Sequence, residues 1–196
     1  MKMMRSFLLM AAATASMTLT ACGPSIVLAP AGPYLLGEAS ATLGRDWTDF
    51  SPAIPGTPKV RMLTIDGPLL NRLYLTEGLV QGDVLVAPQA RREATTPTYD
   101  PAMTVTEQVE FITDSVTAMG YERVTSSDPR PVQVSGARGV RFDVEGVSTD
   151  GLNYRGRAQA VKSGDTLYVA IYLAPTEHYF QATLASAEAT MDSIVF

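Results

Sequence analysis

Two pairs of carboxylates are the residues of this chain whose spacing could support catalysis. Asp46 and Asp49 flank Trp47, and Asp143 and Glu145 lie two residues apart, which places them on the same side of a strand. Paired carboxylates can act as general acid and general base in the hydrolysis of a glycan such as peptidoglycan. Acidic side chains also commonly face solvent without any catalytic role. We favour the solvent-facing interpretation and keep an envelope glycan hydrolase as an alternative hypothesis.

His178 is the only histidine, so one chain cannot supply a metal site that needs several histidines. It lies between Glu177 and Tyr179 at the expected start of a helix, where a surface position is the simpler interpretation. No serine lies in a Gly-x-Ser-x-Gly motif, and the sequence contains neither a Gly-rich phosphate-binding loop nor a calcium-loop pattern. We therefore expect no catalytic residue, no metal and no cofactor.

The only tryptophan lies among charged residues. Trp47 and Phe50 are close to Arg45, Asp46 and Asp49 in the sequence. Exposed aromatic side chains can anchor a protein partner, which makes Trp47 and Phe50 possible partner-binding residues. A tryptophan that covers the edge of a sheet would fit the same sequence, and we favour that alternative.

Arg155 and Arg157 alternate with their neighbours on a predicted strand, so the two arginines share one face of the sheet. Two guanidinium groups on one face could bind an anionic glycan or a carboxylate of a partner. They could equally pair with Asp143 or Glu145 on the neighbouring strand. We favour the cross-strand pairing and keep partner binding as a possibility.

The first 21 residues have the layout of a secretory signal peptide. Lys2 and Arg5 precede an apolar run at residues 7–19, and small residues precede Cys22, the only cysteine. The apolar run is too short to cross a bilayer comfortably. A single free thiol would be unusual on an exported protein, because such a protein meets an oxidising environment.

Residues 19–22 (LTAC) resemble the lipobox of bacterial lipoproteins. The resemblance implies cleavage of the signal peptide 1–21, lipid transfer to the Cys22 sulfur, and acylation of the new amino group with a chain such as palmitate. Gly23, and not aspartate, follows the cysteine, which in similar lipoproteins indicates the outer membrane. We expect a protein that is held to the membrane by its N-terminal lipid and faces the periplasm.

Residues 22–33 contain three prolines and no charge. Because proline favours extended backbone, we interpret this segment as a tether that lifts the domain about 30 Å off the membrane. A terminus without a specific role is the alternative. Residues 34–196 are then expected to form a single globular domain.

Net charge limits the partners of the mature protein. Removal of residues 1–21 leaves 13 basic and 20 acidic residues, and so a net charge of −7. This charge argues against a nucleic-acid partner and against electrostatic docking to anionic lipids. No later run is long and apolar enough for a second membrane span.

Two helices are predicted from apolar residues that recur every three or four positions. The first covers about residues 104–119, and Thr104 with Glu107 fits a capping box at its start. The second covers about residues 176–192, with Thr176 as its N-cap. The apolar stripes consist of Val105, Val109, Ile112, Val116 and Met119 in the first helix and of Phe180, Leu184, Ala187 and Met191 in the second.

Apolar or alternating segments that end at turn residues predict strands on both sides of the first helix. The run at residues 167–173 is the most apolar, so we expect it at the centre of a meander of antiparallel strands. Strands and helices segregated in this way predict an α+β fold, in which an antiparallel β-sheet packs against two main helices. The predicted strands are residues 60–65, 69–75, 121–125, 132–134, 139–147, 152–161 and 167–173.

The C-terminal half also resembles PsbP-like (Mog1/PsbP) domains. The resemblance rests on the strand at residues 168–172 (YVAIY) and on the ending at residues 191–196 (MDSIVF), and it covers residues 104–196. It implies a sheet–helix sandwich that serves as a binding or assembly-accessory module, because the family shares no enzymatic activity. It implies no functional residue.

We therefore expect a lipid-anchored periplasmic domain that binds another envelope protein or helps an envelope complex to assemble, without catalysis. The alternatives are the glycan hydrolase and a carrier of a small apolar ligand. A carrier would need an apolar cavity between the sheet and the helices.

Overall fold

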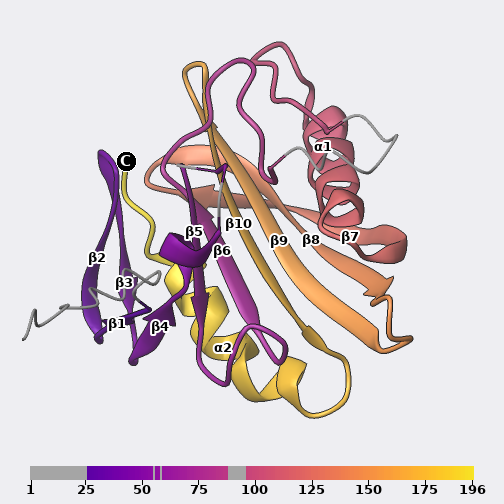
Figure 1. Cartoon of the computed structure of the whole chain (residues 1–196). Helices are drawn as coiled ribbons and strands as arrows, with labels where there is room; N and C mark the ends of the chain where they lie inside the picture. Colours follow the sequence, from indigo (N-terminus) through magenta and orange to yellow (C-terminus); the bar gives the residue numbers. More distant parts are fainter. Residues whose placement is uncertain (1–25, 55, 58, 88–95) are drawn as a thin grey trace, which may run out of the picture.

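The structure is a computed structural model that describes residues 26–54, 56, 57, 59–87 and 96–196 of the 196-residue chain (Figure 1). The predicted signal peptide and Cys22 lie outside the described residues. In the part of the chain that is described, no helix is long and apolar enough to span a membrane.

Within the described residues, an antiparallel sheet of eight strands forms the centre of the domain, in the order β1-β4-β5-β6-β10-β9-β8-β7 (Figure 1). A hairpin of β2 and β3 forms a separate sheet, and two helices pack on the large one. The predicted α+β fold, with an antiparallel sheet against two main helices, is therefore confirmed. The strands are β1 (Val27–Ala29), β2 (Gly32–Leu36), β3 (Ala39–Leu43), β4 (Trp47–Asp49), β5 (Val60–Thr64), β6 (Arg72–Thr76), β7 (Glu122–Val134), β8 (Ala137–Val147), β9 (Asn153–Ser163) and β10 (Thr166–Pro175). The helices are α1 (Val105–Ala118) and α2 (Tyr179–Asp192), with a short 3-10 helix at Ser51–Ala53.

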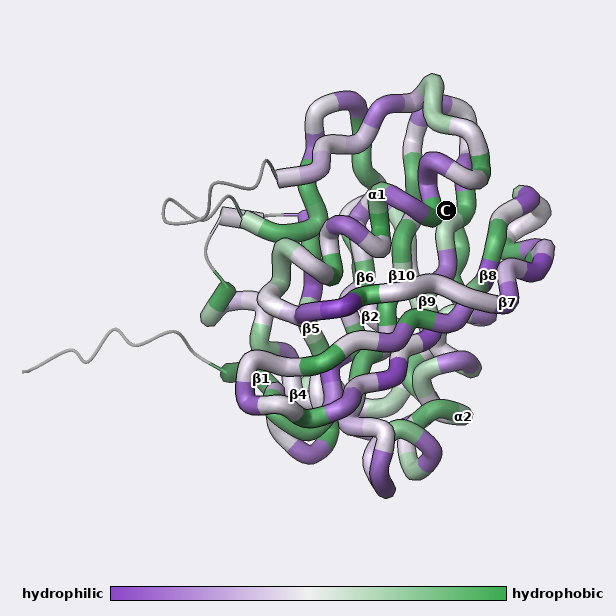
Figure 2. Tube along the Cα trace, turned by 90° about the vertical axis from the view of Figure 1, so that its right-hand side faces the viewer, coloured by the Kyte–Doolittle hydropathy of each residue, from purple (hydrophilic) through white to green (hydrophobic). Residues whose placement is uncertain are grey.

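The two faces of the sheet carry two separate apolar cores. On β10, Val169 and Ile171 belong to the core that includes α1, and Ala170 and Tyr172 belong to the core that includes α2. Because successive strand residues face opposite sides, a strand covered on both faces must be apolar throughout. This explains the apolar run at residues 167–173, and its predicted central position is confirmed by the place of β10 between β6 and β9. Figure 2 shows hydrophobic residues along the inner strands and hydrophilic ones at the outer turns.

Helix α1 begins as predicted. The Thr104 hydroxyl accepts a hydrogen bond from the Glu107 N–H at 3.3 Å, and the Glu107 carboxylate accepts one from the Thr104 N–H at 2.7 Å. The predicted stripe is wrong at Val105, which is 57% exposed, because the buried face is centred on Phe111. The Phe111 ring packs against that of Tyr99, with centroids 6.2 Å apart. The buried residues of α1 are Gln108, Phe111, Ile112, Ser115 and Val116.

Helix α2 begins three residues later than predicted, at Tyr179. β10 continues to Pro175, and the Thr176 N–H then donates to the carbonyl of Asn153 at 2.9 Å. Thr176 therefore extends the pairing with β9 and does not cap the helix. The N-cap is His178, whose φ of 67° is a left-handed conformation that non-glycine residues rarely adopt.

The predicted tether is wrong for residues 27–33, which belong to the folded domain. β1 pairs with β4, β2 begins at Gly32, and the N–H of Ala31 donates to Asp46 Oδ1 at 2.8 Å. Proline favours the extended backbone of a tether, but the same backbone suits a strand at the edge of a sheet. The extended conformation of this segment was therefore predicted correctly from the sequence, but its pairing with β4 and β3 was not.

The predicted strand at residues 69–75 is wrong in its first half. Gly67 has a φ of 105°, and its carbonyl accepts hydrogen bonds from the N–H groups of Leu70 and Asn71. These bonds form a turn, so β6 begins only at Arg72. The turn borders the candidate binding site.

β7 is one long strand where the sequence predicted two short ones, at residues 121–125 and 132–134. Its register against β8 shifts at two places, close to Arg123 and Asp128, which both have positive φ. These irregularities, together with the charges and prolines of β7, protect the free edge of the sheet from pairing with another chain.

Candidate functional site

Trp47 lies in the core and not on the surface. Its side chain is 1% exposed and shares a core with Leu36 and Leu43 of the β2–β3 hairpin, whereas Phe50 is half-buried against the other core. The prediction of Trp47 as an anchor for a partner is therefore wrong, because the chain itself covers the indole. The favoured alternative fits better, since β4 lies one strand from the edge of the sheet.

Arg155 and Arg157 pair with carboxylates on the neighbouring strand, as the favoured alternative predicted. The register of β8 and β9 sets Arg157 opposite Asp143 and Arg155 opposite Glu145. Arg157 Nε lies 2.9 Å from Asp143 Oδ1, and Arg155 Nε lies 3.4 Å from Glu145 Oε1. Both guanidinium groups thus face carboxylates of their own chain.

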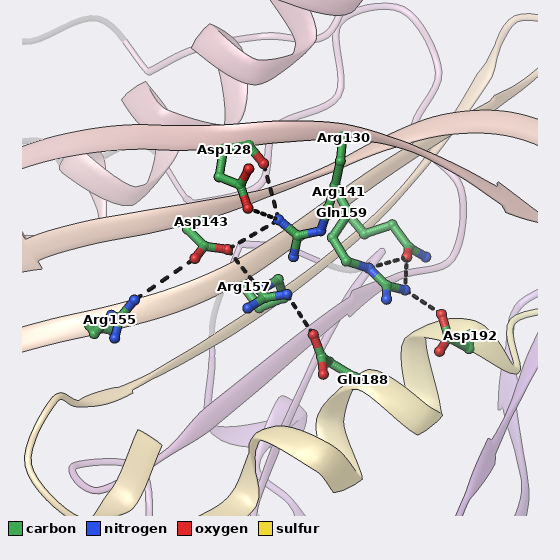
Figure 3. Close-up of polar contacts among 9 residues, drawn as sticks. All are labelled: Asp128, Arg130, Arg141, Asp143, Arg155, Arg157, Gln159, Glu188 and Asp192. Carbon is green, nitrogen blue, oxygen red and sulfur yellow. Dashed lines mark hydrogen bonds and ion pairs between the residues drawn. The ribbon is translucent and has the colours of Figure 1, made fainter. Parts of the chain in front are cut away.

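Asp143 is the centre of a charged network that connects strands β7, β8 and β9 with one another and with α2 (Figure 3). Besides Arg157, its carboxylate faces Arg130 at 3.6 Å and Arg155 at 3.9 Å. Arg157 also pairs with Glu188 of α2 at 2.7 Å. The side chains of Asp143 and Arg157 are each only 16% exposed, so removal of either charge would leave the other poorly solvated.

A second group of polar contacts fastens the end of α2 to the sheet (Figure 3). Arg141 donates to the side chain of Gln159 at 3.1 Å and pairs with Asp192, the last residue of α2. The Gln159 amide in turn donates to the carbonyl of Met191 at 3.1 Å. These contacts indicate a structural role for this face of the sheet.

The other predicted carboxylate pair holds the N-terminal strands. Asp46 accepts the Ala31 N–H, and Asp49 Oδ2 accepts the Tyr34 hydroxyl at 2.7 Å. Burial, together with the nearby Asp49 carboxylate, raises the pKa of Tyr34, so its hydroxyl stays a proton donor. Asp46 and Asp49 therefore connect β1, β2 and β4.

His178 is exposed, with its ring edge-on to that of Tyr179 at a centroid distance of 5.1 Å. Among the residues that the structure describes, no group of three or more His, Cys, Asp or Glu could hold a metal ion. The structure therefore brings together only Asp143, Glu145, Arg155 and Arg157 of the candidates, and it brings them together as ion pairs.

A groove opens on the α1 side of the sheet, at the end that α1 does not cover. α1 packs on β7, β8 and β9, which leaves part of β5 and β6 without a helix above it. Two adjoining hollows of about 340 and 550 Å³ lie there and share Leu69, Arg72 and Met119. Leu69 and Leu152 border the larger hollow and are 73% and 54% exposed. We call this site the Arg72 groove; its other apolar lining residues include Val60, Met62, Leu70, Leu85 and Pro175.

Arg72 is a half-buried cation that has no carboxylate partner within the described part of the chain. Its Nε donates to the carbonyl of Pro68, and its Nη1 donates to the hydroxyl of Tyr121 at 3.2 Å. Among the described residues, no carboxylate lies within 4.0 Å of its guanidinium. The other half-buried arginines of the described chain all have such a partner; they are Arg61, Arg130, Arg141, Arg155 and Arg157.

Three tyrosines surround the Arg72 side chain. The guanidinium lies 6.0 Å from the ring centroid of Tyr121, and the rings of Tyr121 and Tyr154 meet edge to face at 4.9 Å. Burial raises the pKa values of Tyr74 and Tyr121, so both hydroxyls stay protonated at neutral pH. The Tyr154 hydroxyl donates a hydrogen bond to the Leu69 carbonyl at 2.7 Å. The Tyr121 hydroxyl accepts one from Arg72 but donates none to the described residues.

Arg72 is not among the residues predicted from the sequence to have a function. The available signal was an arginine inside the apolar run at residues 69–75, where a charge must be partly buried with its apolar neighbours. The groove itself could not be foreseen, because it depends on which strands α1 covers.

No protein-family model matches the chain, and no curated protein matches its sequence. Solved structures do resemble it. Cyanobacterial PsbP (CyanoP) from Synechocystis aligns with a TM-score of 0.54 at 12% identity, over 91% of this chain and 99% of CyanoP. A crystal structure from Bacteroides thetaiotaomicron aligns with a TM-score of 0.50 at 10% identity, over 85% of this chain. This chain covers 48% of that protein, or about half of its length.

The yeast Ran-binding protein Mog1p from Saccharomyces cerevisiae is also similar, with a TM-score of 0.49 at 9% identity over 88% of this chain and 95% of Mog1p. The likeness to CyanoP extends over most of the chain, beyond residues 104–196 to which the sequence resemblance was limited. At such low identities the likeness shows the fold alone, and the chain has a PsbP/Mog1-like fold.

Proposed function

We propose that this chain is a non-catalytic, lipid-anchored binding protein of a bacterial envelope, attached through Cys22 to the outer membrane and facing the periplasm. The Arg72 groove is its binding site, and its ligand is a small molecule with an apolar body. The observation that carries the proposal is the exposure of Leu69 and Leu152 around a hollow of ligand size. Exposed apolar side chains that gather at a concave site mark a binding surface.

The geometry favours the carrier over the other two functional hypotheses. Asp46, Asp49 and Asp143, considered for hydrolysis, all make internal contacts. Trp47, considered as an anchor for an envelope protein, is buried. The groove lies beside α1 on the same face of the sheet, so it is an open site and not the enclosed cavity between sheet and helix that the carrier hypothesis expected, but it offers a concave apolar surface of ligand size. The proposal therefore does not include a protein partner, and retention of another protein without a small molecule would count against it.

The position of β1 supports close attachment to the membrane. Residues 23–25 alone separate Cys22 from Ile26, and four peptide units span at most about 14 Å. An acylated Cys22 would therefore hold the domain near the lipid surface and not 30 Å above it. Ile26, Val27 and Leu28 are 55%, 49% and 63% exposed, and Figure 2 shows the hydrophobic start of β1. These side chains suit the membrane interface.

Lipid attachment depends on one residue. Cells grown with an alkyne analogue of palmitate should label the wild type and not Cys22→Ser, because Cys22 is the only cysteine in the chain. In-gel fluorescence after dye conjugation measures the label. Gly23→Asp is the matched control: it should keep the label but move the protein from the outer-membrane to the inner-membrane fraction. An unlabelled wild type, or equal labelling of Cys22→Ser, would contradict the anchor.

Substitution at the rim of the groove tests the binding function. The wild type, extracted from its own membranes and examined by native mass spectrometry, should carry a small-molecule adduct. Leu69→Glu should carry much less of it, because the substitution places a charge among apolar walls, and it should remain folded because Leu69 is 73% exposed.

Leu35→Glu is the matched control, since Leu35 is 75% exposed and does not line the groove. This variant should keep the adduct. A wild type that shows only its own mass, or that retains another protein and no small molecule, would contradict the proposal.

A further inference from the structure

We propose that the ligand of the Arg72 groove is a small monocarboxylate with a hydrocarbon body, and that Arg72 and Tyr121 bind its carboxylate. The inference rests on the proposed function, because it assigns the ligand class of the same groove. A medium-chain fatty acid has this chemistry.

The first argument is the missing counter-charge of Arg72. Removal of a charged group from water is unfavourable unless an opposite charge and hydrogen bonds replace the water. Arg61, Arg141 and Arg157 are half-buried as Arg72 is, and each meets a carboxylate of this chain. Arg72 meets none among the described residues, and it borders both hollows of the groove. A carboxylate brought by a ligand would supply the partner that the described residues do not.

The second argument is the set of donors at this point of the groove. A guanidinium has five N–H donors, and the contacts of Arg72 with Pro68, Tyr74 and Tyr121 leave at least two of them. Two parallel N–H groups suit the two oxygens of a carboxylate. The Tyr121 hydroxyl accepts from Arg72 and has its own proton to donate. Because burial raises the pKa of Tyr121, that proton is retained at neutral pH.

The third argument concerns the charge of the ligand. Arg72 and Asp150 are the charged residues that line the described groove, and Asp150 is exposed on the turn between β8 and β9. α1 ends next to the groove, at Met119 and Gly120. A helix presents partial negative charge at its C-terminal end, which opposes an anion. One guanidinium in this setting suits a single negative charge better than the double charge of a phosphate.

The fourth argument concerns the body of the ligand. Beyond Arg72, the walls are formed mainly by aliphatic side chains, and no second cation lines the described groove. The hollows, at about 340 and 550 Å³, fall within the range of small-molecule sites. The structure therefore assigns the polar end of the ligand to Arg72 and its hydrocarbon end to the walls around Leu69 and Met62.

The test compares octanoate with octanol, which has the same chain length and no charge. The full-length lipoprotein in lipid nanodiscs is titrated by isothermal calorimetry, with protein-free nanodiscs as the blank. Octanoate should bind at least about tenfold more tightly than octanol, since a hydrogen-bonded charge pair contributes that much. Arg72→Met should abolish the preference by weakening octanoate alone, and Arg72→Lys should restore part of it.

Asp150→Asn is the matched charge control. This substitution removes a negative charge from the same groove, whereas Arg72→Met removes a positive one. The Asp150→Asn protein should therefore bind octanoate at least as tightly as the wild type. Circular dichroism shows whether each variant is folded. Should Arg72→Met fail to fold, the comparison of octanoate with octanol on the wild type still decides the question.

Equal affinities of the wild type for octanoate and octanol would overturn the carboxylate inference and leave the apolar groove in place. Octanoate binding that Arg72→Met does not weaken would overturn it as well. Binding of neither molecule would overturn the proposed function itself, so the two failures are distinguishable.

Discussion

Trp47→Ala should lower the free energy of unfolding by about 4 kcal/mol, the usual cost of replacing a large buried aromatic side chain by alanine. The indole is 1% exposed and lies in the core that the sheet, the β2–β3 hairpin and α2 share. The hairpin belongs to a separate sheet, so packing against residues such as Trp47 holds it in place, together with the Tyr34–Asp49 hydrogen bond and the pairing of Ser40 with Val195. Urea unfolding followed by far-UV circular dichroism measures the change, because the variant lacks the only tryptophan.

Trp47→Phe distinguishes packing from hydrogen bonding at the same position. The Nε1 of Trp47 is buried without a hydrogen-bond partner among the described residues, so phenylalanine loses apolar contact but no hydrogen bond. It should cost clearly less than alanine. Leu35→Ala, at a side chain that is 75% exposed, should stay within about 0.5 kcal/mol of the wild type. A small effect of Trp47→Ala, together with wild-type tryptophan emission typical of an exposed indole, would contradict the burial of Trp47.

Asp143→Asn should lower the free energy of unfolding by about 2–3 kcal/mol, because it leaves buried positive charge without its counter-charge. Three guanidinium groups face this carboxylate, and the nearest, that of Arg157, is only 16% exposed. Glu188 still neutralises part of the Arg157 charge, which is why we expect less than the cost of about 3–5 kcal/mol that is typical of a broken buried ion pair.

Glu145→Gln is the matched control for Asp143→Asn. Both residues lie on β8 and pair with Arg155, but the Glu145 side chain is 58% exposed. Exposed ion pairs contribute about 0–1 kcal/mol, so this variant should unfold close to the wild type. Equal effects of the two substitutions in urea unfolding would show that the buried network around Asp143 does not stabilise the fold as described.

Local signals in the sequence predicted the elements that depend on neighbours along the chain. Thr104 and Glu107 define the start of α1 by contacting each other. The apolar run of β10 reflects burial on both faces of one strand. The cross-strand pairing of Arg155 and Arg157 with Asp143 or Glu145 could be predicted because a short turn joins β8 and β9, but which arginine meets which carboxylate depends on the register that the structure shows.

Elements that depend on distant partners were missed. The extended backbone of residues 27–29 was predicted, but its pairing with β4 requires a strand some twenty residues away. The start of α2 was placed too early because Thr176 resembles an N-cap, whereas its N–H completes the pairing of β10 with β9. A charged neighbourhood made partner binding by Trp47 a possibility beside the favoured position at the sheet edge, whereas alternation along β4 turns its side chain into the core.

The candidate site could not be predicted for a related reason. Leu69, Arg72, Met119 and Leu152 come from a turn, a strand, the end of a helix and a hairpin, and no spacing in the sequence connects them. Only the path of α1 over β7, β8 and β9 leaves this part of the sheet open. The one local sign was an arginine in an apolar segment.

The central claim is that the Arg72 groove binds a small molecule with an apolar body, and chemical-shift mapping by nuclear magnetic resonance tests it most directly. The isotope-labelled lipoprotein in nanodiscs is titrated with octanoate. Saturable shifts of backbone amides should concentrate at residues 69–72, 119–121 and 148–152, which border the groove. The absence of saturable shifts, or shifts centred on the network around Asp143 and α2, would contradict the account.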